Sequence, residues 1–134
     1  MVKGTEDKTA QKMEEQRTNE VDFYISRFSP PVQQRLIAIR AIALKTFQGA
    51  TERLCHSLPA FAHDGRVFMF YGAYKQHASI CVGYDWIDFL KLQYPQFTYT
   101  KATIIFPHDE PLPEDVVQVI CDLVNQGRRN VTGM

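Results

Sequence analysis

The sequence lacks a net charge. Its 15 Lys and Arg residues balance 15 Asp and Glu residues over 134 positions. This balance argues against a large basic surface, and so against non-specific binding to nucleic acids or anionic membranes. A chain without net charge also lacks one protection against self-association, so a homodimer is compatible with this composition. We therefore expect neither nucleic acid nor a membrane among its partners.

Long hydrophobic runs are also missing. No apolar stretch approaches the roughly 20 residues of a membrane-spanning helix, and no secretory hydrophobic segment opens the sequence. The three cysteines, Cys55, Cys81 and Cys121, are odd in number, far apart and embedded in apolar runs. Such cysteines are typical of reduced, mostly buried thiols. The sequence therefore predicts a cytoplasmic protein.

Familiar metal-binding and phosphate-binding motifs are absent. There is no Cys-x-x-Cys, His-x-x-x-His or His-Glu-x-x-His spacing, and the seven glycines are scattered rather than gathered in a phosphate-binding loop. His56, His77 and Cys81 would form a metal site only by converging across neighbouring strands. A nucleophilic pair of His77 with Cys55 or Cys81 is conceivable, but nothing in the sequence predicts a lowered thiol pKa. Buried packing explains these cysteines better.

The sequence does contain a hydrophobic fraction of 45%, which is enough to build the core of one domain. Residues 1–17 are polar and predict a flexible tail, whereas residues 18–130 predict a single domain. Helical spacing of apolar residues predicts a short helix that ends at Ser29 and a second helix over about residues 30–48. We expect Ile37 and Leu44 to widen the buried face of this second helix.

The segment over residues 51–83 predicts a three-stranded antiparallel meander. Its first strand alternates through His56 and ends or bends at Pro59, because proline cannot continue a central ladder. The pair Asp64-Gly65 is expected of a tight hairpin turn between the first and second strands. A third strand follows from His77.

The middle strand of this meander, residues 67–74, is apolar on both faces. Strict alternation places Phe68 and Phe70 on one face, opposite Met69 and Tyr71. A strand with two apolar faces is typical of an internal strand that is covered on both sides. Core packing explains these aromatics better than a base-stacking platform for RNA, because few basic residues lie nearby.

The remainder of the sequence predicts a short helix over residues 85–93, a strand over residues 99–106 and a last helix over residues 113–127. Together these elements predict an α+β fold. An antiparallel β-sheet of about four to five strands is packed by the N- and C-terminal helices.

The histidines are the first candidates for chemistry. His56 shares a strand face with two leucines, and a histidine there is more often a hydrogen-bonded core group than a ligand. His77 follows a tight turn and begins a strand, so its side chain could reach the mouth of the sheet. An enzyme that uses His77 as a base is less favoured, because no activating carboxylate partner can be named. The sequence therefore favours a non-enzymatic protein.

Two motifs resemble a known family. The first is Glu52–Phe61 (ERLCHSLPAF), followed by Tyr74–His77 (YKQH); the second is Lys101–Pro107 (KATIIFP), continued by Asp109–Pro113 (DEPLP). Their order and spacing resemble the YdhG-like, frataxin-like intracellular iron chaperone family, much of which is known only as a domain of unknown function. The resemblance covers about residues 19–127. The positions that match the family pattern are Glu52, Pro59, Phe61, His77, Lys101, Thr103, Phe106 and Pro113.

The resemblance implies a YdhG-like/frataxin-like sandwich and a protein that binds iron and delivers it to iron–sulfur or haem assembly proteins. Iron favours oxygen and imidazole donors. Two departures from the family pattern are His56, where the family has tyrosine, and Ile105, where it has arginine. Lys and Arg residues interleaved in the first 17 positions also weaken an acidic iron-binding ridge. The carboxylate candidates for iron are Glu14, Glu15, Glu20 and Asp22.

A second hypothesis needs no iron. In it the protein is a non-enzymatic small-ligand or protein-binding module with a pocket near Pro59 and His77, between the sheet and the helix ends. The residues that we expect to line this pocket are His56, Pro59, Phe61, Tyr71, His77 and Lys101.

Overall fold

The computed structural model describes residues 19–132 and the side chains of residues 19–128. The predicted flexible tail, residues 1–17, lies outside this range. A short helix over residues 19–26 precedes the other elements. These are α2 (Pro30–Thr46), β1 (Thr51–Cys55), β2 (Leu58–His63), β3 (Arg66–Ala73), β4 (His77–Cys81), α3 (Tyr84–Gln93), β5 (Thr98–Tyr99), β6 (Thr103–Pro107) and α4 (Glu114–Thr132).

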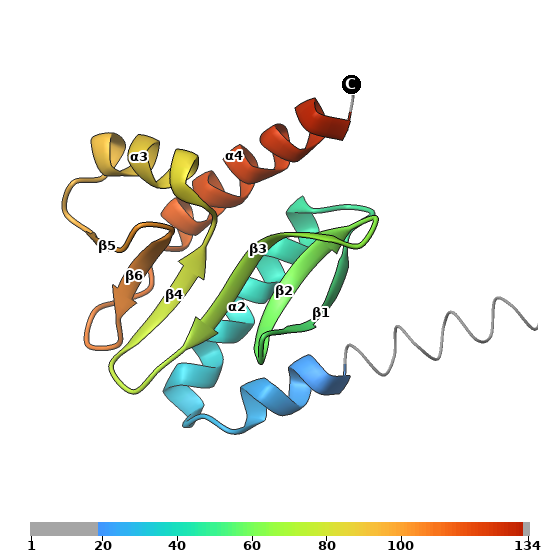
Figure 1. Ribbon diagram of the computed structural model, residues 1–134. Coiled ribbons are helices and arrows are strands. Elements are labelled where there is room, and N and C mark those ends of the chain that lie inside the picture. Colours follow the sequence, from blue (N-terminus) through green and yellow to red (C-terminus); the bar gives the residue numbers. More distant parts are fainter. Residues whose placement is uncertain (1–18, 133–134) are drawn as a thin grey trace, which may run out of the picture.

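The six strands form one sheet in the order β1-β2-β3-β4-β6-β5, and every neighbouring pair is antiparallel. The predicted α+β class is thus confirmed, with one or two more strands than expected. Helices α2 and α4 lie side by side across one face of the sheet (Figure 1). The core between these layers contains Leu36 and Ile39 of α2, Ile80 of β4, and Ile120 of α4, all fully buried.

The first predicted strand is two strands in the structure. The chain reverses at His56 and Ser57, whose φ angles are 52° and 67°, and β1 pairs with β2 from Cys55 and Leu58 onwards. Pro59 therefore lies inside β2, opposite Leu54, and the prediction that the strand ends or bends at Pro59 is wrong, because the chain reverses at His56 and Ser57 instead. Proline is tolerated there because the ladder between β2 and β3 begins only at Ala60, so no partner on β3 needs its missing N–H group.

The alternation predicted for β3 fails at Phe68. Phe61 is paired with Met69 and Ala62 with Val67, so Phe68 is an extra residue in a β-bulge. The bulge turns Phe68 towards the helices, where its ring centroid lies 4.8 Å from that of Phe47, the residue that caps α2.

The expectation that β3 is covered on both faces is also wrong. In Figure 1, α2 and α4 lie behind the sheet, and no described helix crosses β2, β3 and β4 in front. Phe70 points to this open face and is only partly buried. A single helical layer leaves the opposite face of the sheet available for contacts with other molecules.

Two predictions about the helices also need correction. Ile37 and Leu44 are each 50% exposed, so they lie outside the buried face of α2. Helix α4 continues through Gly127 to Thr132 instead of ending at Gly127. None of the described helices is long and apolar enough to cross a membrane.

Candidate functional site

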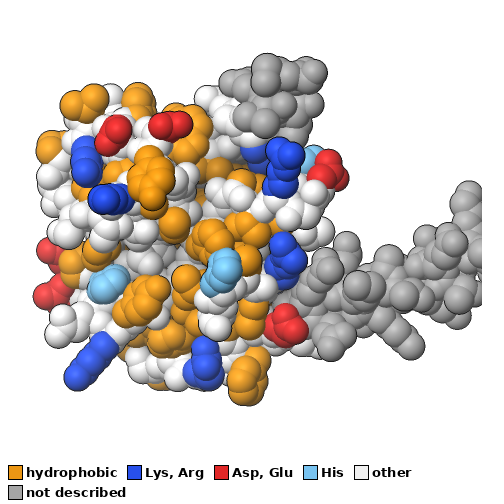
Figure 2. All heavy atoms as spheres, in the orientation of Figure 1, with side chains coloured by type: hydrophobic (Ala, Val, Ile, Leu, Met, Phe, Trp, Pro, Cys, Tyr) orange, Lys and Arg blue, Asp and Glu red, His pale blue; other side chains and the backbone are white. Residues whose placement is uncertain are grey.

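A cavity of about 430 Å³ lies on the open face of the sheet. The cavity extends across β3, β4 and β6 and is lined by side chains that alternate residues of these strands present to this face. Phe70 of β3 pairs with Cys81 of β4, and Cys81 pairs with Thr103 of β6. Figure 2 looks onto this face and shows hydrophobic side chains across its centre, with histidines among them and basic side chains mainly towards its edges. The lining residues are His56, Leu58, Phe70, Tyr71, Tyr74, His77, Ser79, Cys81, Thr100, Thr103 and Ile105.

His56 enters the cavity from the tight turn between β1 and β2. Two-residue hairpin turns with positive φ at both positions favour Asn and Gly, because other side chains are strained there. Here His56 and Ser57 occupy both positions. The imidazole of His56 lies 6.4 Å from the ring of Phe70, measured between centroids. The turn therefore holds a histidine over the apolar centre of the open face.

His77 lies at the other end of the cavity, where β4 begins. Its ring centroid is 5.1 Å from that of Tyr74, which is 47% exposed. His108 secures this turn, because its backbone N–H donates to the carbonyl of Gln76 and its Nε2 lies 2.8 Å from the carbonyl oxygen of Tyr74. His77 thus lies at the edge of the cavity, beside a turn that the loop after β6 holds in place.

The structure brings together three of the six residues in the predicted pocket: His56, Tyr71 and His77. Phe61 does not line the cavity, since it is buried on the helix side with its ring centroid 5.5 Å from that of Phe47. Pro59 is buried within β2. Lys101 is exposed in the turn before β6 and contributes no lining.

Tyr71 borders the cavity, but its ring lies on the helix side of the sheet, stacked on Phe61 with 5.9 Å between the ring centroids. The hydroxyl donates to Glu52 over 2.7 Å, and burial together with the adjacent Glu52 charge raises the pKa of Tyr71 above its ordinary value. Arg40 donates to the same Glu52 carboxylate from Nε and Nη2. Glu52, Tyr71 and Arg40 therefore form a buried polar network that joins β1, β3 and α2.

Asp22, one of the predicted iron ligands, belongs to the same network. It accepts a hydrogen bond from Nη1 of Arg40. Burial acts to lower the pKa of Arg40, but its hydrogen bonds to Asp22 and Glu52 outweigh burial and raise it. Glu20 is exposed, and the other two candidates, Glu14 and Glu15, lie outside the described residues.

The cavity on the open face contains no acidic side chain beside its histidines. His77 therefore has no carboxylate there to activate it as a base. His77 and Cys81 lie four residues apart on one strand, a separation of about 13 Å, which is too long for a nucleophile–base pair. No group of three or more His, Cys, Asp or Glu residues that could hold a metal exists among the described residues.

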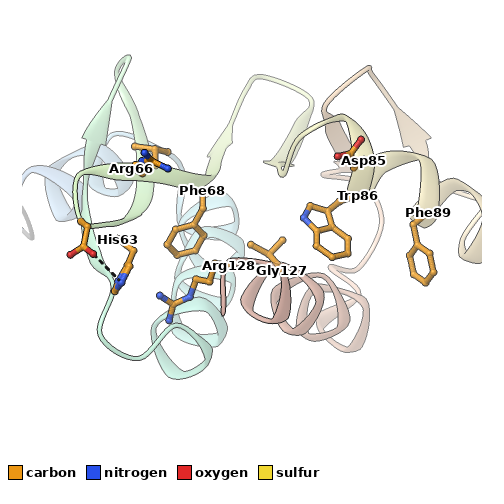
Figure 3. A pocket seen from close by; sticks show the side chains of 11 residues that line it. His63, Arg66, Phe68, Asp85, Trp86, Phe89, Gly127 and Arg128 are labelled. Atoms are coloured by element: carbon orange, nitrogen blue, oxygen red, sulfur yellow. Dashed lines mark ion pairs between the residues drawn. The ribbon is translucent and has the colours of Figure 1, made fainter. Parts of the chain in front are cut away.

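A second cavity, of about 960 Å³, escaped the sequence analysis. Pairing between β3 and β4 ends at Phe70 and Cys81, after which the chain turns at Gly83 into α3. The cavity opens between the beginning of β3, α3 and α4 (Figure 3). The helical spacing of Trp86 and Phe89 could have indicated an aromatic face on α3. The β-bulge that turns Phe68 towards this cavity cannot be recognised from the sequence. The lining residues are His63, Asp64, Arg66, Val67, Phe68, Asp85, Trp86, Phe89, Val124, Gly127 and Arg128.

Comparisons with known proteins bear on the fold. No family model and no curated protein matches the sequence. The structure is similar to the crystal structure of YdhG, a DUF1801 family protein from Bacillus subtilis, with a TM-score of 0.72, 13% identity, and coverage of 84% of this chain and 92% of that chain.

It is also similar to an uncharacterized conserved protein from Lactobacillus casei, with a TM-score of 0.54, 18% identity, and coverage of 81% of this chain and 92% of that chain. These likenesses support the YdhG-like part of the resemblance seen in the sequence and give no support to its frataxin-like part. The chain therefore has the fold of the DUF1801 protein YdhG.

Proposed function

We propose that the protein is a non-enzymatic binding module that holds a small ligand on the open face of its sheet. The observation that carries this proposal is the convergence of His56, His77 and Phe70 on one cavity. The helices α2 and α4 cover only the opposite face, so this cavity stays accessible to solvent.

The lining indicates the chemistry of the ligand. Leu58, Phe70 and Ile105 offer apolar contacts, whereas hydroxyl and imidazole groups offer hydrogen bonds. No Asp, Glu, Lys or Arg lines the cavity, so a ligand would find no carboxylate, ammonium or guanidinium group there. A largely apolar, uncharged molecule with one or two hydrogen-bonding groups fits best, and a volume of about 430 Å³ lies within the usual range of small-molecule sites.

The strained turn before β2 supports the same proposal. Non-glycine residues with positive φ cost about 1–3 kcal/mol each and concentrate at functional sites. His56 and Ser57 both adopt this conformation, with φ of 52° and 67°. An asparagine–glycine pair would form the same turn at lower cost, but it would remove the imidazole from the cavity.

Cys81 provides a direct test, because its thiol lines the cavity while Cys55 does not. We would screen uncharged aromatic and heteroaromatic compounds by ligand-detected NMR. We would then measure how each bound compound changes the rate at which iodoacetamide alkylates the two cysteines. A ligand on the open face should slow modification of Cys81 and leave that of Cys55 unchanged.

Phe70→Ala should weaken binding of such a compound by about tenfold, because Phe70 forms the apolar centre of the cavity. Leu92→Ala is the matched control, since Leu92 is 82% exposed on α3 and lines neither cavity. Compounds that bind without protecting Cys81, or that bind Phe70→Ala with unchanged affinity, would contradict the proposal.

A further inference from the structure

Two departures from local structural preference shape the second cavity. The β-bulge in β3 places Phe68 on the side of α4, and bulges commonly re-aim a side chain beside a site. Gly127 lies inside α4, where glycine costs about 1 kcal/mol relative to alanine. A Cβ at Gly127 would lie 2.5 Å from Cζ2 of Trp86, so the glycine lets the indole ring rest against the helix backbone. Both departures therefore position an aromatic ring of the same cavity.

The aromatic rings form walls around the cavity. Figure 3 shows Phe68 and Trp86 projecting from β3 and α3 towards α4, on either side of the cavity. Phe89 follows Trp86 on α3 and is 42% exposed, so part of its ring remains accessible to a ligand. These three rings offer flat apolar surfaces for a flat ligand.

Charge is distributed unevenly along the cavity. His63, Arg66 and Arg128 lie towards one end, whereas Asp85 lies above Trp86 towards the other (Figure 3). Asp64, also at the basic end, pairs with His63 over 3.5 Å. The guanidinium of Arg128 is held in place 5.2 Å from the centroid of the Phe68 ring, with Nη2 donating to the carbonyl of Gln48 over 2.8 Å.

We propose that this cavity binds a planar aromatic molecule that carries one anionic group. The aromatic body lies among Phe68, Trp86 and Phe89, and the anionic group lies at the end formed by Arg66 and Arg128. A guanidinium recognises a carboxylate or a phosphate with paired donors, which suits Arg66 because it is exposed at the rim. This ligand class differs from the uncharged ligand proposed for the open face of the sheet.

The single tryptophan makes the test direct. Trp86 is the only tryptophan in the chain, so its indole N–H gives one assigned signal in a ¹H–¹⁵N NMR spectrum. We would titrate the full chain with 2-naphthoate and, separately, with 2-naphthamide, which has nearly the same shape without the charge. The naphthoate should shift the indole signal saturably and bind about tenfold more tightly than the amide.

Variants separate charge from shape. Arg66→Gln should lower naphthoate affinity towards that of the amide, with Arg128 retaining part of the difference, whereas Lys91→Gln, which removes a basic residue of α3 outside the cavity, should change neither affinity. Phe89→Ala should weaken both ligands, and Phe70→Ala, on the open face, should weaken neither. Absence of a saturable indole shift, equal affinity for the two ligands, or full naphthoate affinity in Arg66→Gln would overturn the proposal.

Discussion

Cys121 shows how a single buried residue contributes to the response of this protein to pH. It is fully buried in α4, and burial, followed by the nearby charge of Asp122, raises the pKa of its thiol from 9.0 to about 12. In the unfolded chain the thiol ionises at its ordinary pKa, while in the folded chain it stays protonated. The contribution of Cys121 to the free energy of unfolding is therefore fully present below the thiol pKa of the unfolded chain. It declines as the pH rises from that value towards the thiol pKa of the folded chain.

The first prediction follows from this difference. The free energy of unfolding should fall by about 1 kcal/mol between about pH 8 and about pH 10. Cys121→Ala should remove most of this decline, although it lowers stability at every pH by leaving a small void. Urea unfolding under reducing conditions at a series of pH values measures both slopes. Cys55→Ala controls for loss of a thiol, and an unchanged slope in Cys121→Ala would contradict the assignment.

The secondary structure elements divide into those that local sequence determines and those that it does not. The breaks between helices were predictable because Ser29-Pro30 and Gly49 act locally, and the turn at Asp64-Gly65 was predictable for the same reason. The turn at His56 and Ser57 was not, because neither residue favours positive φ and Pro59 is a stronger local signal.

The bulge at Phe68 shows a second limit of sequence reasoning. A bulge is fixed by the packing of Phe68 against Phe47, a residue far away in the sequence, so alternation within β3 does not reveal it. The same limit applies to the candidate sites. His77 borders the cavity because β4 alternates as expected from the sequence, whereas Phe61 faces the core because the first strand was in fact a hairpin.

The β1–β2 hairpin carries the second prediction. Ser57→Gly keeps His56 in place and removes the strain of one residue with positive φ, offset in part by the greater flexibility of glycine in the unfolded chain. The free energy of unfolding should therefore rise by about 0.5–1 kcal/mol. Chemical denaturation of the variant measures this change, with Ser26→Gly in the first helix as a control that should lose stability. A loss of stability in Ser57→Gly would show that its side chain contributes more than its strain costs.

At the scale of the whole molecule, the two faces of the sheet are covered unequally. Helices α2 and α4 cover one face and supply the core, while the other face and the gap between β3 and α3 remain hollow. The buried network of Arg40, Glu52 and Tyr71 belongs to the covered side and fixes β1 to α2. The carboxylates of Glu52 and Asp22 already accept hydrogen bonds from Arg40, so they stabilise the fold and are not free to bind a ligand.

Iron binding by the N-terminal carboxylates stays a prediction, and the network sharpens it. Anaerobic calorimetry with iron(II) should detect binding heat that the triple variant Glu14/Glu15/Glu20→Ala abolishes, if these carboxylates are the donors. Asp22→Ala should leave iron affinity unchanged and lower the free energy of unfolding by less than about 1 kcal/mol, because Asp22 already pairs with Arg40 at a half-exposed position. Asp88/Asp109→Ala is a control for removing acidic residues elsewhere. Absence of binding heat in the unmodified protein would eliminate the iron role, and loss of affinity in Asp22→Ala would mean that iron displaces Arg40.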